Sequence, residues 1–214
     1  MNFIKRIFLS VVVVSAMIAG CDTGPERELI VINNPGNDTS AAKQYNIRAI
    51  QCLKDGDLDS AEADAKLALD AASDYGPAQN TLGLIRLEQG KLNDAARIFH
   101  LAATNMPRDP SPFFNLGLVW EKAGRREKAE EEYRKALKRD PENIKVKSNL
   151  VRALVLMGRK GKETRGLLKD VVLKDDREEW RDWAMRELKL MPKEDDSTFD
   201  LFEKESDKDG KNQP

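Results

Sequence analysis

Small and apolar residues recur along this chain at a fixed step of 34 positions. The step relates a column of four glycines and three columns of small residues: Gly56, Gly90, Gly124 and Gly158; Ala61, Ala95 and Ala129; Ala68, Ala102 and Ala136; Ala49, Gly83 and Gly117. Phe99 and Tyr133, and Pro107 and Pro141, keep the same step. A repeat of this length is the signature of stacked structural units. The pattern therefore predicts a repeat architecture over residues 42–177.

The length of the unit and its order of small and large residues resemble the tetratricopeptide repeat. The resemblance implies an all-α fold, a helix-turn-helix solenoid of about three to four repeats. In each repeat a first helix ends near the glycine column and a second helix begins soon after. The resemblance also implies that the small columns allow close helix packing, and that Phe99 and Tyr133 fill the space between layers.

We expect repeats at residues 42–75, 76–109, 110–143 and, in divergent form, 144–177. Arg48 stands in the column that holds Leu82 and Leu116, so the first repeat is imperfect. The fourth carries Val151 and Glu163 where small residues are expected, which indicates that its second helix is shifted by a residue. Terminal repeats are commonly atypical because one face lacks a neighbour.

A capping helix is predicted at residues 178–191, where Trp180, Trp183, Ala184 and Leu188 follow a helical spacing. We expect this helix to cover the end of the last repeat. Two neighbouring tryptophans are also typical of a partner surface. A structural homo-oligomer formed through the Trp180/Trp183 end is therefore an alternative.

The first 20 residues have the pattern of a secretory signal peptide. Lys5 and Arg6 precede an apolar run from Ile7 to Ile18, and small residues follow it. The run is shorter than the roughly 20 residues that a membrane span needs.

The string Ile18-Ala19-Gly20-Cys21 resembles the lipobox of bacterial lipoproteins. The resemblance implies cleavage before Cys21 and acylation of that cysteine, so that the lipid anchors the protein to a membrane. Asp22 resembles the signal that keeps enterobacterial lipoproteins in the inner membrane. We expect a body facing the periplasm, with the inner membrane favoured over the outer, and a tether over residues 21–41.

The resemblance to tetratricopeptide repeats also implies a binding groove on the first helices, where other proteins bind. The 34-residue step gives candidate groove positions: Asn46, Ile50, Asn80, Leu84, Phe114, Leu118, Lys122, Ser148 and Arg152. Asparagine side chains can pair with a peptide backbone, and aliphatic side chains can hold anchor residues. The alternative is that these residues only coat a wetted surface.

Charge is unevenly distributed although the net charge of the chain is only −1. Residues 143–169 contain eight basic residues and one acid. We treat five of them as a basic patch that could bind an anionic glycan or lipid: Lys145, Lys147, Arg159, Lys160 and Lys162. Residues 192–214 form an acidic, polar tail. Its large apolar residues all lie in the segment Phe199-Asp200-Leu201-Phe202. We expect this tail to be disordered.

The sequence contains few residues in patterns that are typical of catalytic or metal-binding sites. His100 is the only histidine, which is too few for the usual metal sites, and Cys52 lies inside the first predicted helix. No nucleophile–base pair can be nominated. We therefore expect a protein that is not an enzyme, needs no cofactor, binds other proteins and does not bind nucleic acid.

Overall fold

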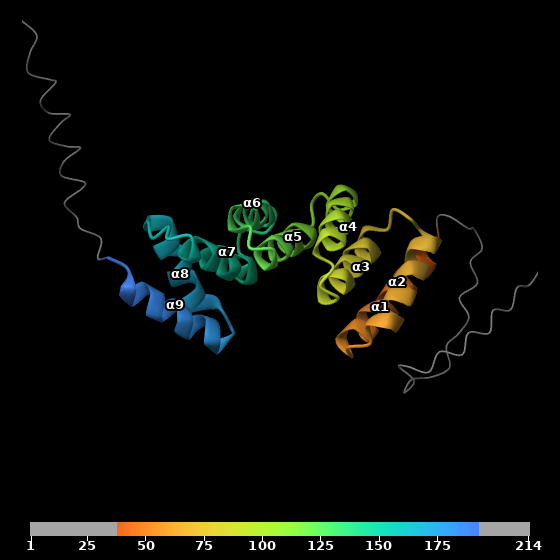
Figure 1. Ribbon diagram of the computed structural model, residues 1–214, viewed down its shortest axis with the longest axis horizontal. Coiled ribbons are helices and arrows are strands. Elements are labelled where there is room, and N and C mark those ends of the chain that lie inside the picture. Colours follow the sequence, from red (N-terminus) through yellow and green to blue (C-terminus); the bar gives the residue numbers. More distant parts are fainter. Residues whose placement is uncertain (1–37, 193–214) are drawn as a thin grey trace, which may run out of the picture. The chain divides into compact units, whose positions relative to one another are not determined.

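A computed structural model describes residues 38–192. The described part contains nine α-helices joined by short turns (Figure 1). Their bounds are α1 Thr39–Lys54, α2 Leu58–Ala71, α3 Gly76–Glu88, α4 Leu92–Asn105, α5 Ser111–Lys122, α6 Arg126–Leu137, α7 Ile144–Leu156, α8 Lys162–Lys174 and α9 Glu178–Leu190. The predicted all-α fold of helix pairs is confirmed. Helix α1 begins three residues before the predicted start of the repeat domain at residue 42, inside the predicted tether.

The glycine column marks the end of each first helix. Gly56, Gly90, Gly124 and Gly158 all have positive φ angles, between 72° and 81°. This left-handed conformation favours glycine because a side chain would meet the following carbonyl group. The column thus terminates α1, α3, α5 and α7 and turns the chain into the next helix, as the sequence predicts.

Polar side chains begin several of the helices. Asp38 accepts hydrogen bonds from the backbone N–H groups of Ser40 and Ala41 at 3.0 and 2.9 Å. Asp57 caps α2 and Asn143 caps α7 in the same manner. These bonds satisfy N–H groups that the first turn of a helix cannot pair internally.

The described helices belong to two compact units, and the boundary between these units falls between Lys91 and Leu92. In the first unit, α1, α2 and α3 pack through small side chains. Ala49, Ala61 and Ala65 are fully buried beside Cys52 and Ile85. Because their side chains are short, the helix backbones can approach closely.

Arg48, which stands in the predicted leucine column, is accommodated as an ion pair. Its guanidinium donates to the buried carboxylate of Asp64 at 2.8 Å and lies 5.5 Å from the ring centre of Tyr45. The first repeat therefore replaces an apolar contact by a charge pair.

The second unit contains α4 to α9. Its central packing feature is Tyr133 of α6, which is fully buried against Gly117 of α5. A Cβ atom at Gly117 would overlap the Tyr133 ring, so the glycine is required by space. Tyr133 fills the interior of this repeat, as predicted.

The fourth repeat shows the predicted shift of one residue. A step of 34 from Ala129, Tyr133 and Ala136 leads to residues 163, 167 and 170. The residues buried at these places are instead Thr164, Leu168 and Val171, each one position later. The turn before α8 is longer than the turn before α6: α6 starts two residues after its glycine and α8 starts four residues after Gly158.

Helix α9 packs against α8 and closes this unit. Ala184 is fully buried with Val151, Leu168 and Val171, and both tryptophans of α9 pack against the same cluster. The predicted capping role of this segment agrees with that packing.

Candidate functional site

The candidate groove residues of the first unit differ in exposure. Ile50 of α1 and Asn80 and Leu84 of α3 are half-buried. Asn46 is buried, with 5% exposure, and its Oδ1 atom has no hydrogen-bond partner. Two aliphatic side chains on adjacent first helices are thus partly open to solvent, whereas Asn46 is not available without movement.

In the second unit, α5 carries three of the predicted residues. Phe114 and Leu118 are half-buried and pack against the cluster around Tyr133. The rings of Phe114 and Tyr133 lie 5.9 Å apart. Lys122 is exposed. The first two side chains therefore support the core and present their remaining surface to solvent.

Ser148 was predicted to line the groove, but this prediction is wrong. The residue is fully buried, and its hydroxyl lies 2.5 Å from the Asp175 carboxylate and 2.7 Å from the Ile144 carbonyl oxygen. Asp175 follows α8 directly. In the last repeat the position is covered by the connection between α8 and α9, so no ligand can reach it.

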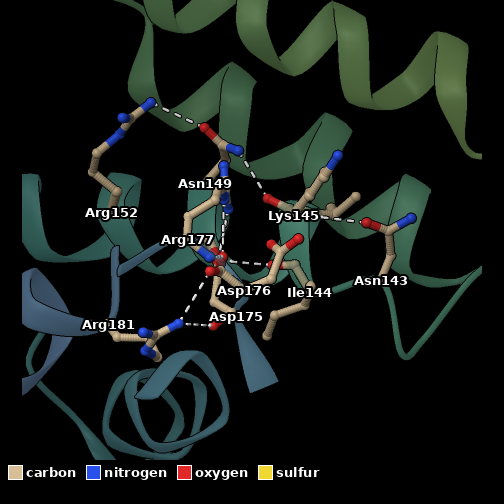
Figure 2. Close-up of polar contacts among 11 residues, drawn as sticks. Asn143, Ile144, Lys145, Asn149, Arg152, Asp175, Asp176, Arg177 and Arg181 are labelled. Carbon is tan, nitrogen blue, oxygen red and sulfur yellow. Dashed lines mark hydrogen bonds and ion pairs between the residues drawn. The ribbon is translucent and has the colours of Figure 1, made fainter. Parts of the chain in front are cut away.

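Arg152 of α7 lies at one end of a polar network in the second unit, and Asn149 links it to the Lys145 carbonyl group (Figure 2). The Arg152 Nε donates to Glu121 at 2.9 Å, and a terminal nitrogen donates to Asn149 at 2.9 Å. The other oxygen of Glu121 accepts the Tyr133 hydroxyl at 2.8 Å. Burial, and next the negative charge of Glu121, raise the pKa of Tyr133 well above its usual value, so its hydroxyl remains protonated.

A second branch of the network leads to the capping helix. The guanidinium groups of Arg152 and Arg177 lie 4.6 and 4.5 Å from the Trp180 ring centre, within the range of cation–π attraction. Arg177 donates to both oxygens of Asp175, at 2.9 and 2.7 Å. Burial opposes the charge of Asp175, but the bonds from Arg177 and Ser148 outweigh it and lower the pKa to about 2.

A surface pocket of about 240 Å³ opens beside this network. It is lined by Arg152, Glu179, Trp180 and Trp183, and the two indoles meet edge to face with 5.9 Å between centres. Arg152 was expected on the groove and the tryptophans on the capping helix, with a partner surface as the alternative; the structure brings them together. Glu121, Asp175 and Glu179 were not predicted, because carboxylates are frequent in this chain and their spacing carries no distinguishing signal.

Two of the five residues of the predicted basic patch form ion pairs with acids from other helices. Lys147 is buried and forms an ion pair with Asp170 at 2.8 Å. Arg159 forms one with Glu130 of α6 at 2.6 Å. Lys145, Lys160 and Lys162 are exposed. Two of the five residues therefore link helices through ion pairs, one buried and one at the surface, which the local count of charges did not reveal.

Other candidate residues have simpler surroundings. His100 is exposed and Cys52 is a buried free thiol. Between residues 38 and 192, no cluster of three or more His, Cys, Asp or Glu side chains is placed to hold a metal ion. None of the helices in the same range has the length and apolar character that a membrane crossing requires. Cys21, Asp22 and the tail segment Phe199–Phe202 lie outside the described residues.

Comparison with known proteins agrees with this architecture. Residues 110–143 match the model of the tetratricopeptide repeat family. The human protein O-mannosyl-transferase TMTC2 is 37% identical over 79 residues, which are 36% of this chain and 9% of that protein. The chain thus spans only a small part of that relative.

Two solved structures have a similar fold at low identity. The pilF protein of Pseudomonas aeruginosa has a TM-score of 0.61 at 18% identity, over 66% of this chain and 64% of that one. The first TPR of Spaghetti, bound to an HSP90 peptide, has a TM-score of 0.54 at 16% identity, over 57% of this chain and 97% of that one. Residues 110–143 therefore match a tetratricopeptide repeat, and the described part of the chain has the helical fold of proteins built from such repeats.

Proposed function

We propose that this protein is a lipid-anchored adaptor of the bacterial cell envelope, which binds segments of partner proteins on the first helices of its repeats. Catalysis has no part in this proposal. Each of the two units presents first helices of its own, and stacked helix pairs form extended binding surfaces as a class. The bound peptide in the Spaghetti domain supports the proposal by analogy of fold.

The observation that carries the proposal is a series of aliphatic side chains at one repeat position. Ile50 of α1, Leu84 of α3 and Leu118 of α5 are related by the 34-residue step, and each is half-buried. The residue before each of them, in the small column, is fixed inside its own unit; Ala49 is fully buried, for example. Apolar side chains that remain partly open at an equivalent position are suited to hold the anchor residues of a partner.

The anchor part of the proposal rests on the N-terminal sequence. Acylation of Cys21 after signal cleavage would hold the protein at a bilayer through several acyl chains, each contributing about 0.8 kcal/mol per buried methylene group. Asp22 favours the inner membrane, with the repeats in the periplasm. In this location the adaptor would assist pilus or secretion machinery, or position envelope enzymes.

The decisive experiment is crosslinking in native membranes followed by affinity purification. We compare the wild type with Leu84→Glu and Leu118→Glu, introduced singly and together. A buried carboxylate at a partner's anchor site is costly, so a discrete set of proteins should disappear from the purified material. Circular dichroism melting must first show that each variant remains folded, because Leu118 also touches the core.

Two exposed leucines on second helices provide matched controls. Leu67 of α2 is 40% exposed and Leu101 of α4 is 48% exposed. Leu67→Glu and Leu101→Glu introduce the same charge in the same units, away from the first helices, and should retain all partners. An identical set of proteins from all variants would reject the first-helix surface as the binding site.

The anchor is tested independently with Cys21→Ser. We expect this variant to leave the membrane fraction and to lose incorporation of an alkyne-labelled fatty acid. Density-gradient separation of inner and outer membranes, with Asp22→Ser as a second variant, tests the sorting signal. Retention of Cys21→Ser in the membrane would contradict lipid anchoring without affecting the adaptor function.

A further inference from the structure

The pocket between α7 and α9 combines side chains that favour a peptide anchor. Trp180 and Trp183 contribute apolar indole surface to its lining, and Arg152 and Glu179 contribute charged groups. Its volume of about 240 Å³ lies below the roughly 300–1,000 Å³ of small-molecule sites, so it suits one or two anchor side chains. Tryptophan and arginine are the residues most enriched where such anchors bind.

We infer that this pocket binds a segment of the same chain, Phe199-Asp200-Leu201-Phe202. Between Lys193 and Pro214 the large apolar residues are Phe199, Leu201 and Phe202, and all lie within this segment. The segment therefore supplies the aromatic anchors that two indole rings attract. The inference concerns the capping helix and stands whether or not a partner binds the first helices.

The length of the connection permits this docking. Six residues separate Pro192, the last described residue, from Phe199. In extended form the connection spans about 23 Å. Trp180 and Leu190, the last residue of α9, are 10 positions apart, a distance of about 15 Å along the helix, and Met191 and Pro192 add about 7 Å in extended form. The segment can therefore return along α9 to the pocket, and a linker this short holds it there at an effective concentration in the millimolar range.

The charges in the pocket lining are compatible with the segment. Asp200 lies between two apolar residues of the segment, and the Arg152 guanidinium, which lines the pocket together with Glu179, lies 4.6 Å from the Trp180 ring centre. A guanidinium has five N–H donors, so Arg152 can bind a further carboxylate while its bonds to Glu121 and Asn149 persist. The Arg152 side chain is 36% exposed and can be reached from solvent.

The test places a photo-reactive residue beside the anchors in the full-length lipidated protein. Replacement of Glu203 by p-benzoylphenylalanine leaves Phe199, Leu201 and Phe202 intact, and mass spectrometry then identifies the cross-linked peptide. We expect crosslinks within one molecule to residues 177–186 and to the Arg152 peptide. The same reagent at Asn212, ten residues beyond Phe202, is the control and should give no such product.

Variants in the segment keep the test free of folding effects, because they lie outside the nine helices. Phe199→Ser and Asp200→Lys should reduce the crosslink yield, the former by about tenfold. Ser197→Ala should leave it unchanged. Trp183→Ala, checked for folding by its melting temperature, should reduce the yield in the same way from the side of the pocket.

Other occupants give distinct results. When isotopically light and heavy chains are mixed, crosslinks that join the two kinds of chain indicate a second copy and would overturn the inference. Crosslinks to a different protein, crosslinks to another surface, or an unchanged yield in Phe199→Ser would also overturn it. Partner recovery in the Leu84 and Leu118 variants is a separate measurement, so failure of one proposal does not decide the other.

Discussion

The third and fourth repeats are neighbours in one unit, yet they achieve their packing with different chemistry. In the third, the absence of a side chain at Gly117 makes room for Tyr133. In the fourth, Val151 occupies the small column, and Leu168 is the large residue opposite; both are fully buried. Each pair fills the space between its two helices, with one large ring in the third repeat and two aliphatic side chains in the fourth. We infer that close packing constrains the volume shared by the pair rather than either side chain alone.

The ends of the two repeats differ as well. A proline, Pro141, follows α6, and the residue one 34-residue step later is Asp175. Asp175 is 2% exposed and joins the end of α8 to Ser148 of α7 and to Arg177. The third repeat is therefore closed by steric means and the fourth by a buried charge. This difference makes the fourth repeat sensitive to pH and to single polar substitutions.

The largest expected effect is that of Gly117→Val in the third repeat. Its side chain would overlap the Tyr133 ring, which cannot move because it is fully buried. We expect the free energy of unfolding to fall by about 3 kcal/mol, measured by denaturant titration. Gly166→Val on α8 is the matched control: no atom lies within 4 Å of its Cβ position, and we expect little loss.

A double variant tests whether shared volume is the relevant quantity. Tyr133→Leu added to Gly117→Val copies the small-column and large-residue pair of the fourth repeat. The double variant should be more stable than the sum of the two single effects implies. If the two changes in the free energy of unfolding simply added, residues 117 and 133 would not compensate each other. The idea that the third and fourth repeats share a packing volume would then be wrong.

The next effect concerns the acid stability of the fourth repeat. The pKa of Asp175 in the folded protein is about 2, below the usual 3.8, so its charge stabilises the fold above pH 4. This contribution, on the order of 2 kcal/mol, is lost as the pH falls through the folded value. We expect Asp175→Asn to lower stability at pH 7 and to flatten its dependence between pH 4 and 2. An unchanged profile in this variant would contradict the role of the charge.

Ser148→Ala should have a smaller effect in the same place. The substitution removes one of the hydrogen bonds to the buried Asp175 carboxylate, whereas the bonds from Arg177 remain. We expect a loss of about 1 kcal/mol. Thr104→Ala removes an exposed hydroxyl that bonds only a helix carbonyl and should cost less. If both variants lost the same free energy of unfolding, the buried Ser148–Asp175 hydrogen bond would contribute no more to stability than an exposed one.

The sequence predicts the features that repeat and misses those that occur once. The 34-residue step locates every helix-ending glycine, and Glu163 at a small-residue position indicates the shift in α8. The burial of Ser148 was not predictable, because a repeat column assumes the same surroundings in each unit. In the fourth repeat, Ser148 is covered by the connection between α8 and α9 and not by a further repeat.

Charge pairs were missed for a related reason. Arg159 and Glu130 are 29 residues apart, and Lys147 and Asp170 are 23 apart, so a count of charges within one segment cannot pair them. The pocket was missed because it too depends on contacts between segments far apart in the sequence. Its tryptophans were recognised as a cluster, but their contact with Arg152 depends on how α9 lies against α7.

The smallest expected effect comes from deletion of Lys160, which makes the turn before α8 one residue shorter. Lys160 is exposed and lies outside the helices, so we expect the free energy of unfolding to change by less than about 1 kcal/mol. Deletion of Gly166 also removes one residue but lies inside α8, where it rotates the following side chains by about 100°. That variant should lose cooperative unfolding of the fourth repeat. Both deletions restore the 34-residue step at Val171, so a difference between their denaturation curves would show that the helix face, and not the sequence spacing, determines the packing of this repeat.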